Sequence, residues 1–80
     1  MIKVRIKYFA ILREQRGLDE EIVSTRAINP IQLYLEIATK HKFTLAPDRI
    51  RAAVNDEFVT QDYALVDGDS IVFLPPMAGG

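Results

Sequence analysis

The first eight residues alternate between apolar and charged side chains. The even-numbered positions hold Ile2, Val4, Ile6 and Tyr8, and basic residues occupy the positions between them. A period of two is typical of a strand with one face on a core and the other in water. The pattern predicts an amino-terminal strand whose outer face is basic.

The following segment predicts a short helix and a second strand. Residues 10–16 are good helix formers and end at Gly17, which suits the left-handed backbone of a helix end. Residues 19–25 have Ile22 and Val23 at their centre, which favours a strand.

The main helix is predicted to begin at Asn29 and Pro30. Asparagine caps free backbone N–H groups, and proline at the first helical position lacks only an N–H that is unpaired anyway. On a helical wheel the polar positions gather on one side: Gln32, Glu36, Thr39 and Lys40. The apolar positions gather on the other: Leu33, Tyr34, Ile37 and Ala38, flanked by Ile31 and Leu35. One face of this helix is therefore expected to pack on a sheet.

The last third of the chain predicts further strands. Residues 50–54 form the third strand and end in a turn at 55–56, after which residues 58–59 pair back across it. An Asp-Gly-Asp turn at 67–69 precedes a β-branched and aromatic strand at 70–74.

This order of elements predicts an α+β fold. We expect a β-grasp (ubiquitin-like) domain, a mixed four- to five-stranded sheet with one main helix across one face. In such a sheet the last strand can lie parallel beside the first. The domain would comprise residues 1–74, and residues 75–80 would form an extended carboxyl-terminal Gly-Gly tail.

Composition excludes several classes of function. The 80 residues suit one domain, 49% are apolar, and the net charge of −1 gives no general attraction to nucleic acid or anionic membranes. With no cysteine and one histidine, a metal centre is not expected. The amino terminus lacks the unbroken apolar run of a signal peptide or membrane span, so a cytoplasmic location is expected.

Two groups of charged residues allow a structural interpretation. Lys3, Arg5 and Lys7 form a basic stripe that either meets an acidic partner surface or remains solvated. Glu20 and Glu21 are expected to face solvent, and adjacent strand residues point to opposite faces, so they form no acid/base dyad.

The carboxyl-terminal segment is the main candidate for function. Residues 70–80 carry no charged side chain, and residues 71–74 are all apolar. Burial in the middle of the sheet would explain the strand. Because the apolar run continues through Pro75 to Ala78, where burial within the chain is harder, the pattern also favours a docking surface for a partner.

The tail has the properties of a semi-rigid arm with one reactive group. Pro75 and Pro76 favour an extended backbone, and six residues at about 3.3 Å each reach roughly 20 Å. Gly79 and Gly80 lack a Cβ and could enter a narrow channel. The terminal carboxylate could attack the α-phosphate of ATP to give an acyl-adenylate, which then accepts sulfur or an amine. The chain has no phosphate-binding glycine motif, so another enzyme must hold the ATP.

Three segments resemble the small, sulfur-carrying subunit of molybdopterin synthase. They are Ala53-Val54-Asn55, Asp67-Gly68-Asp69 and the ending Phe73-Leu74-Pro75-Pro76-Met77-Ala78-Gly79-Gly80. A terminal Gly-Gly occurs in several ubiquitin-like families, but two prolines before a small residue and Gly-Gly are more specific. Met77 departs from the β-branched residue often found at that position.

The resemblance implies a role for each tail residue. Gly80 would be adenylated by an enzyme similar to ubiquitin-activating enzymes, converted to a thiocarboxylate by a sulfur donor protein, and used to sulfurate cyclic pyranopterin monophosphate. Gly79 would be its slim neighbour. The docking segment would comprise Leu74, Pro75, Pro76, Met77 and Ala78. The implied partner is the synthase large subunit, in a heterotetramer that supplies the catalytic side chains. No cofactor would be bound by this chain itself.

Two other classes of function remain open. A sulfur carrier for thiamine thiazole synthesis and a ubiquitin-like protein modifier share the fold and the tail, although such sequences usually lack the Pro-Pro segment. A purely structural β-grasp interaction domain is the third hypothesis.

Overall fold

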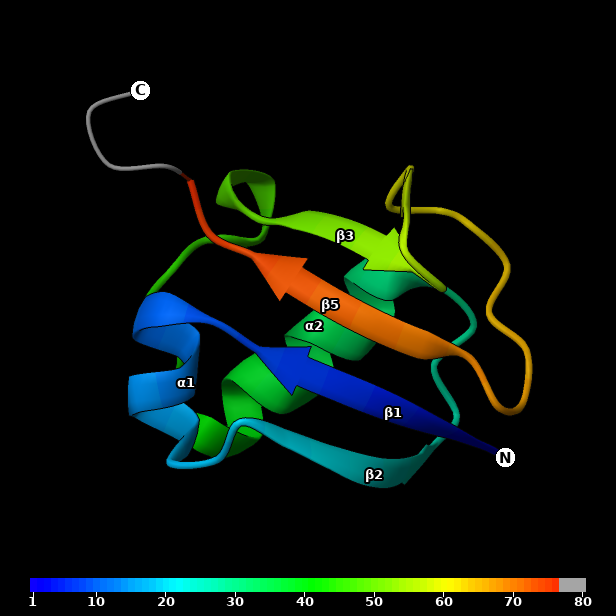
Figure 1. Cartoon of the computed structure of the whole chain (residues 1–80), viewed down its shortest axis with the longest axis horizontal. Helices are drawn as coiled ribbons and strands as arrows, with labels where there is room; N and C mark the ends of the chain where they lie inside the picture. Colours follow the sequence, from blue (N-terminus) through cyan, green and yellow to red (C-terminus); the bar gives the residue numbers. More distant parts are fainter. Residues whose placement is uncertain (77–80) are drawn as a thin grey trace.

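The computed structural model describes residues 1–76, which form a five-stranded mixed sheet with one long helix packed across it (Figure 1). The elements in chain order are β1 (Ile2–Tyr8), α1 (Ala10–Arg16), β2 (Glu20–Thr25), α2 (Pro30–His41), the 3₁₀ helix η1 (Pro47–Arg49), β3 (Arg51–Val54), β4 (Glu57–Val59) and β5 (Ser70–Leu74). This arrangement confirms the α+β, β-grasp prediction. The second and third strands each begin one residue later than predicted.

The sheet order is β2-β1-β5-β3-β4, with β5 at the centre. β5 runs parallel to β1 and antiparallel to β3, while β1 with β2 and β3 with β4 are antiparallel pairs. The parallel pairing of the first and last strands is confirmed. The central place of β5 accounts for its apolar sequence along the middle of the sheet.

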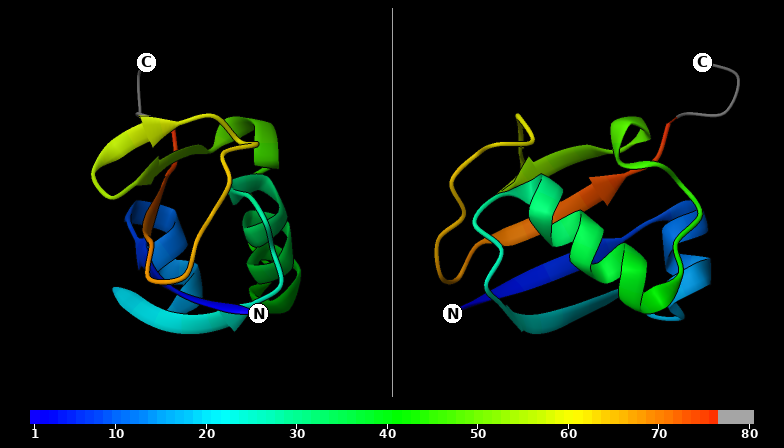
Figure 2. Two further views of the ribbon diagram at one scale, coloured as in Figure 1. Left: turned by 90° about the vertical axis from the view of Figure 1, so that its right-hand side faces the viewer. Right: turned by 180° about the vertical axis from the view of Figure 1, so that it is seen from behind.

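Helix α2 crosses only one face of the sheet, as the right-hand view of Figure 2 shows. The Asn29 side chain accepts a hydrogen bond from the backbone N–H of Gln32 at 2.9 Å, which confirms the predicted cap. Leu33, Tyr34 and Ile37 are buried against the sheet. Leu35, predicted to flank that face, is instead 47% exposed. Each residue of an α-helix is rotated by about 100° from the one before, so Leu35 points away from the sheet that Tyr34 faces.

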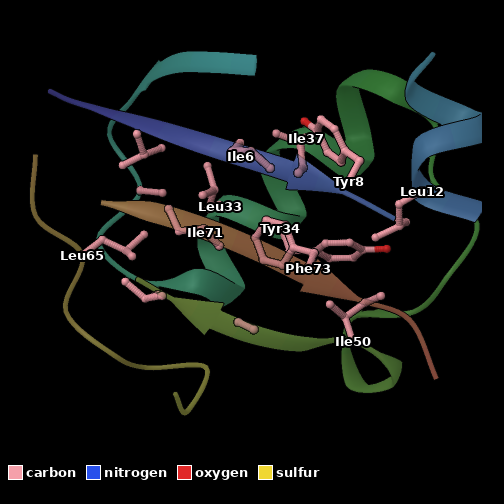
Figure 3. Packing of buried hydrophobic residues seen from close by; sticks show 14 residues of the cluster. Ile6, Tyr8, Leu12, Leu33, Tyr34, Ile37, Ile50, Leu65, Ile71 and Phe73 are labelled. Atoms are coloured by element: carbon pink, nitrogen blue, oxygen red, sulfur yellow. The ribbon is translucent and has the colours of Figure 1, made fainter. Parts of the chain in front are cut away.

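The hydrophobic core lies between α2 and the strands (Figure 3). The Tyr34 and Phe73 rings meet edge to face with centroids 5.4 Å apart, and Tyr8 meets Phe43 in the same way at 6.0 Å. The Tyr34 hydroxyl donates to the carbonyl oxygen of Leu45 at 2.7 Å, so its buried polar end has a partner. β5 therefore contributes Phe73 to the centre of the core.

Helix α1 closes one end of this core. Leu12 is fully buried, and Gly17 ends the helix at φ 81° with its N–H bonded to the Arg13 carbonyl oxygen at 2.8 Å. This confirms the predicted short helix. Within residues 1–76, no helix combines the length and apolar character needed to cross a membrane.

A charged cluster between α1 and β2 corrects the expectation that Glu21 faces solvent. Arg16 donates two hydrogen bonds to the Glu21 carboxylate, at 2.7 and 2.8 Å, and the Tyr8 hydroxyl donates a third at 2.6 Å. The Glu21 side chain is only 17% exposed. Glu21 pairs with Ile6 of β1 and so shares the helix-covered face, where α1 brings Arg16 to it.

Candidate functional site

The chain leaves the centre of the sheet at Leu74, the last residue of β5, and continues through Pro75 and Pro76. These three residues belong to the predicted docking segment. The other predicted site residues, Met77, Ala78, Gly79 and Gly80, lie outside the described residues, and their roles remain predictions. The site can therefore be built from the base of the tail and what surrounds it.

The start of β5 is held by hydrogen bonds from two turns. Lys3 N–H donates to the Asp67 carboxylate at 2.8 Å, and Gly68 N–H donates to the Lys3 carbonyl oxygen at 2.8 Å. Arg5 N–H donates to the Asp69 carbonyl oxygen at 2.9 Å. The Asp-Gly-Asp turn thus sets the register in which β5 enters the sheet beside β1.

The second turn connects β3 to β4 and reaches the same point. The Asn55 side chain donates to the Asp69 carboxylate at 3.0 Å and accepts from the Ser70 N–H at 3.0 Å. Asp69 is buried and also accepts from the Val66 N–H at 2.9 Å. Asn55 and Asp56 both have positive φ, 51° and 73°, as a two-residue hairpin turn requires. The structure thus brings together the two turns singled out in the sequence.

The face of the sheet opposite α2 combines apolar and basic side chains. Because directly paired residues share a face, the strand register places Val72 and Leu74 on this side. We call it the open face; in Figure 1 it is turned toward the viewer, in front of α2. The other strands contribute the following side chains to the open face: Lys3, Arg5 and Lys7 of β1, Glu20, Ile22 and Ser24 of β2, Arg51 and Ala53 of β3, and Phe58 of β4.

A groove of about 630 Å³ opens beside the base of the tail. Its lining comes from the β1–α1 junction, from η1 with β3 and β4, and from the end of β5: Phe9, Ala10, Asp48, Arg49, Arg51, Phe58, Leu74, Pro75 and Pro76. This volume is within the range of about 300–1,000 Å³ typical of ligand pockets. Three of the predicted docking residues thus line a recess whose walls come from distant parts of the chain.

One wall of the groove is a stacked pair of side chains. The Arg51 guanidinium carbon lies 4.1 Å from the centroid of the Phe58 ring, a cation–π geometry. Phe58 is 58% exposed, which is unusual for a large aromatic side chain. In residues 1–76, no group of three or more His, Cys, Asp or Glu side chains is placed to hold a metal ion. Because Arg51 stacks on the exposed Phe58 ring, the groove offers an aromatic surface and a fixed positive charge, a combination suited to a protein partner.

The sequence analysis missed Phe9, Arg51 and Phe58 as parts of this site. A signal for the last two was present, because a two-residue turn at 55–56 dictates that Ala53 pairs with Phe58. That pairing puts Phe58 on the face opposite the buried Ala52 and Val54. No local signal places Phe9 in the same groove as Leu74, since that depends on the pairing of β1 with β5.

The fold, the central last strand and the tail that follows it define a ubiquitin-like β-grasp protein. The sequence profile of the ThiS family matches residues 6–80. The molybdopterin synthase sulfur carrier subunit of Escherichia coli is 31% identical over 81 residues, covering 96% of this chain and 99% of that protein. The chain belongs to the ThiS family.

Solved structures agree with this assignment. A protein described as molybdopterin converting factor subunit 1, from Pyrococcus furiosus, has a TM-score of 0.78 and 31% identity, with 96% of this chain and 100% of that chain covered. The small archaeal modifier protein 1 of Methanosarcina acetivorans has a TM-score of 0.79 and 26% identity, with 100% and 98% covered. The resemblance inferred from the sequence is confirmed.

Proposed function

We propose that this protein is a sulfur carrier in molybdenum cofactor biosynthesis. The observation that carries the proposal is the ending Pro75-Pro76-Met77-Ala78-Gly79-Gly80, attached directly to the central strand of a β-grasp domain. The proposal is supported by the full-length similarity to the Escherichia coli sulfur carrier subunit. In this division of labour residues 1–74 are the β-grasp domain, and residues 75–80 are the tail whose last residue carries the sulfur.

The carrier chemistry takes place at the terminal carboxylate of Gly80. The carboxylate oxygen attacks the α-phosphate of ATP, pyrophosphate leaves, and an acyl-adenylate forms. Hydrosulfide delivered by a donor protein then attacks the carbonyl carbon, and AMP leaves with the acyl oxygen. The product is a thiocarboxylate, with Gly79 as the slim neighbour that lets the carbonyl approach the reacting groups.

The nucleotide and the catalytic side chains belong to partner proteins. An activating enzyme of the ubiquitin-activating type binds the ATP, since this chain has no phosphate-binding glycine motif. The synthase large subunit receives the tail and uses the thiocarboxylate sulfur on cyclic pyranopterin monophosphate, in a heterotetramer in the cytoplasm. The Escherichia coli relative is itself a subunit of molybdopterin synthase, which supports a partner of this kind. Leu74, Pro75, Pro76, Met77 and Ala78 form the docking segment of the tail.

The intact mass of the protein tests this function. After incubation with ATP, the activating enzyme and a sulfur donor, the mass should rise by the difference between one sulfur and one oxygen atom. A variant with one extra residue after Gly80 should show no rise, because its reactive carboxyl no longer belongs to the Gly-Gly end. An unchanged mass of the natural chain, with an activating enzyme proven active on another carrier, would contradict the proposal.

A second candidate function is protein modification. It is favoured by the similarity over the whole chain to the Methanosarcina acetivorans modifier protein. In that case an amine of a target lysine takes the place of sulfur at the acyl-adenylate, and an isopeptide bond forms. Lysine-linked adducts of Gly80 in tryptic digests of cells would favour this candidate, and their absence alongside thiocarboxylate would favour the sulfur carrier.

A further inference from the structure

Strand β2 forms one edge of the sheet and has a free row of backbone groups. The Tyr8 N–H donates to the Asp19 carbonyl oxygen at 2.8 Å, and bonding pairs alternate in an antiparallel ladder, so the odd-numbered residues of β2 bond to β1. The backbone N–H and C=O groups of Glu20, Ile22 and Ser24 therefore point away from the sheet. Among residues 1–76, no backbone–backbone hydrogen bond outside the ladders involves these three residues.

This edge lacks the features that usually keep an edge strand from pairing with another chain. Such strands are commonly very short or carry lysine or proline. The opposite edge of the sheet fits that rule, because β4 has three residues. β2 has six residues, none of them lysine or proline, and includes the β-branched Ile22, Val23 and Thr25. Since Ile22 is also 63% exposed, β2 is suited to accept a further strand.

The charges at the two ends of β2 are opposite. Glu20 begins the strand and Arg26 directly follows it, and both side chains are exposed. Thr25 and Ala27, on either side of Arg26, are buried, so Arg26 continues the alternation that puts Glu20 on the open face. Arg26 forms no salt bridge with another of residues 1–76, and Glu20 binds Arg5 through one of its two carboxylate oxygens.

We propose that two copies of this chain pair edge to edge through β2, antiparallel, with Val23 opposite Val23 of the second copy on the twofold axis. Ile22 then lies opposite Ser24 of the second copy, and Glu20 lies opposite Arg26, each twice by symmetry. The residues with free backbone groups face one another, so Ile22 and Ser24 exchange hydrogen bonds. Sliding one copy by two residues, the smallest shift that keeps this bonding pattern, removes both charge pairs.

This pairing goes beyond the carrier function and leaves the candidate site uncovered. β2 lies along the lower edge of the sheet in Figure 1, and β5 is the third strand from that edge. The groove lies on the other side, lined by Phe58 and the end of β5 among others. Because the twofold axis reverses the strand direction, the two β5 strands of the joined sheet point in opposite directions. The base of each tail therefore stays accessible to other proteins.

Sedimentation equilibrium of the full chain, from micromolar to millimolar concentration, tests the pairing. One strand pair makes a small interface, so we expect a weak dimer that forms reversibly as the concentration rises. Glu20→Arg and Arg26→Glu each place like charges opposite one another twice and should weaken the dimer about tenfold. The variant that combines both changes restores opposite charges and should dimerise like the natural chain.

Mixing the two single variants separates a specific charge pair from a general effect of net charge. The Glu20→Arg chain has arginine at both ends of β2 and the Arg26→Glu chain has glutamate at both, so the mixture should form a heterodimer as tight as the natural dimer. Glu57→Arg is the matched control, because it makes the same change on β4 at the opposite edge. Alone it should dimerise like the natural chain, and mixed with Arg26→Glu it should pair less tightly.

Two substitutions of Ser24 test the backbone hydrogen bonds. The Ser24 N–H points outward, so proline removes this donor without breaking the ladder with β1. Ser24→Pro should abolish the dimer, whereas Ser24→Ala retains the N–H and should leave it intact. Circular dichroism and unfolding midpoints close to those of the natural chain would show that the variants remain folded.

Three results would overturn this inference. A natural chain that stays monomeric at millimolar concentration has no such pairing. A dimer that persists in folded Ser24→Pro uses another surface, and a dimer that both charge reversals leave unchanged uses another register. None of these results affects the carrier function, which the intact mass tests separately.

Discussion

On β5, Ile71 and Phe73 point toward α2 and are fully buried, whereas Val72 and Leu74 point to the open face and remain partly exposed. The two faces are built from alternate residues of the same strands. On the covered face, aromatic and aliphatic side chains meet α2 and complete a core. On the open face, similar side chains stand among basic residues. The difference teaches that the covered face supplies stability, whereas the open face leaves apolar and basic side chains accessible.

The largest expected difference between the faces involves two phenylalanines. Phe73→Ala on the covered face should lower the free energy of unfolding by about 3–5 kcal/mol, because it leaves a cavity in the core. Phe58→Ala on the open face should cost about 1 kcal/mol or less, chiefly the contact with Arg51. Urea unfolding monitored by circular dichroism measures both. Equal losses would mean that the open face is also a core.

The next difference involves the adjacent glutamates of β2. The two hydrogen bonds from Arg16, aided by the Tyr8 hydroxyl, hold the pKa of Glu21 at about 2, below its ordinary 4.5. Glu21→Gln should therefore lower the free energy of unfolding by about 2 kcal/mol at pH 7. Glu20→Gln, which removes the exposed pair with Arg5, should cost about 0.5 kcal/mol or less.

The pH dependence of the free energy of unfolding checks the prediction for Glu21→Gln. A carboxylate whose pKa is lowered by folding stabilises the protein above the pKa of the unfolded chain, and loses that effect as the pH falls through the folded value. The difference between the natural chain and Glu21→Gln should thus be complete above about pH 5 and shrink toward pH 2. A difference independent of pH would show that Arg16 does not stabilise the ionised carboxylate.

The smallest expected difference involves two isoleucines. Ile71→Val in the core should cost about 0.5–1.5 kcal/mol, since one buried methylene is lost. Ile22→Val on the open face, where the side chain is 63% exposed, should change stability by less than about 0.5 kcal/mol. Thermal unfolding of both variants measures these changes, and the midpoint should fall clearly for Ile71→Val only. If Ile22→Val destabilises as much as Ile71→Val, part of the open face is covered in solution.

Local patterns predicted most elements of the fold. The alternation of Ile2 to Tyr8 predicted β1, Asn29 and Pro30 predicted the start of α2, and the run from Ser70 to Leu74 predicted β5 with the bounds that the structure has. Each of these signals depends on neighbours in the chain. The parallel pairing of β1 with β5 was also predictable, because few topologies connect such an order of elements.

Contacts between distant segments were harder to predict. Glu21 follows a charged residue in the sequence and has no mark of burial, yet Arg16 and Tyr8 enclose its carboxylate. The groove joins Phe9, Phe58 and Leu74 from three different strands or their ends. Neither site corresponds to a motif, because its members come from separate elements that only the pairing of distant strands and helix packing bring together.

The amino-acid sequence alone determined the approximate places of the strands, of the two α-helices and of the turns that connect the last strands. These features follow from backbone preferences and from the periodicity of apolar side chains, which act over a few residues. Only the tertiary structure decided which side of the sheet α2 leaves open, and which side chains surround the base of the tail. Those outcomes depend on strand register, and register is set jointly by turns and core contacts far apart in the chain.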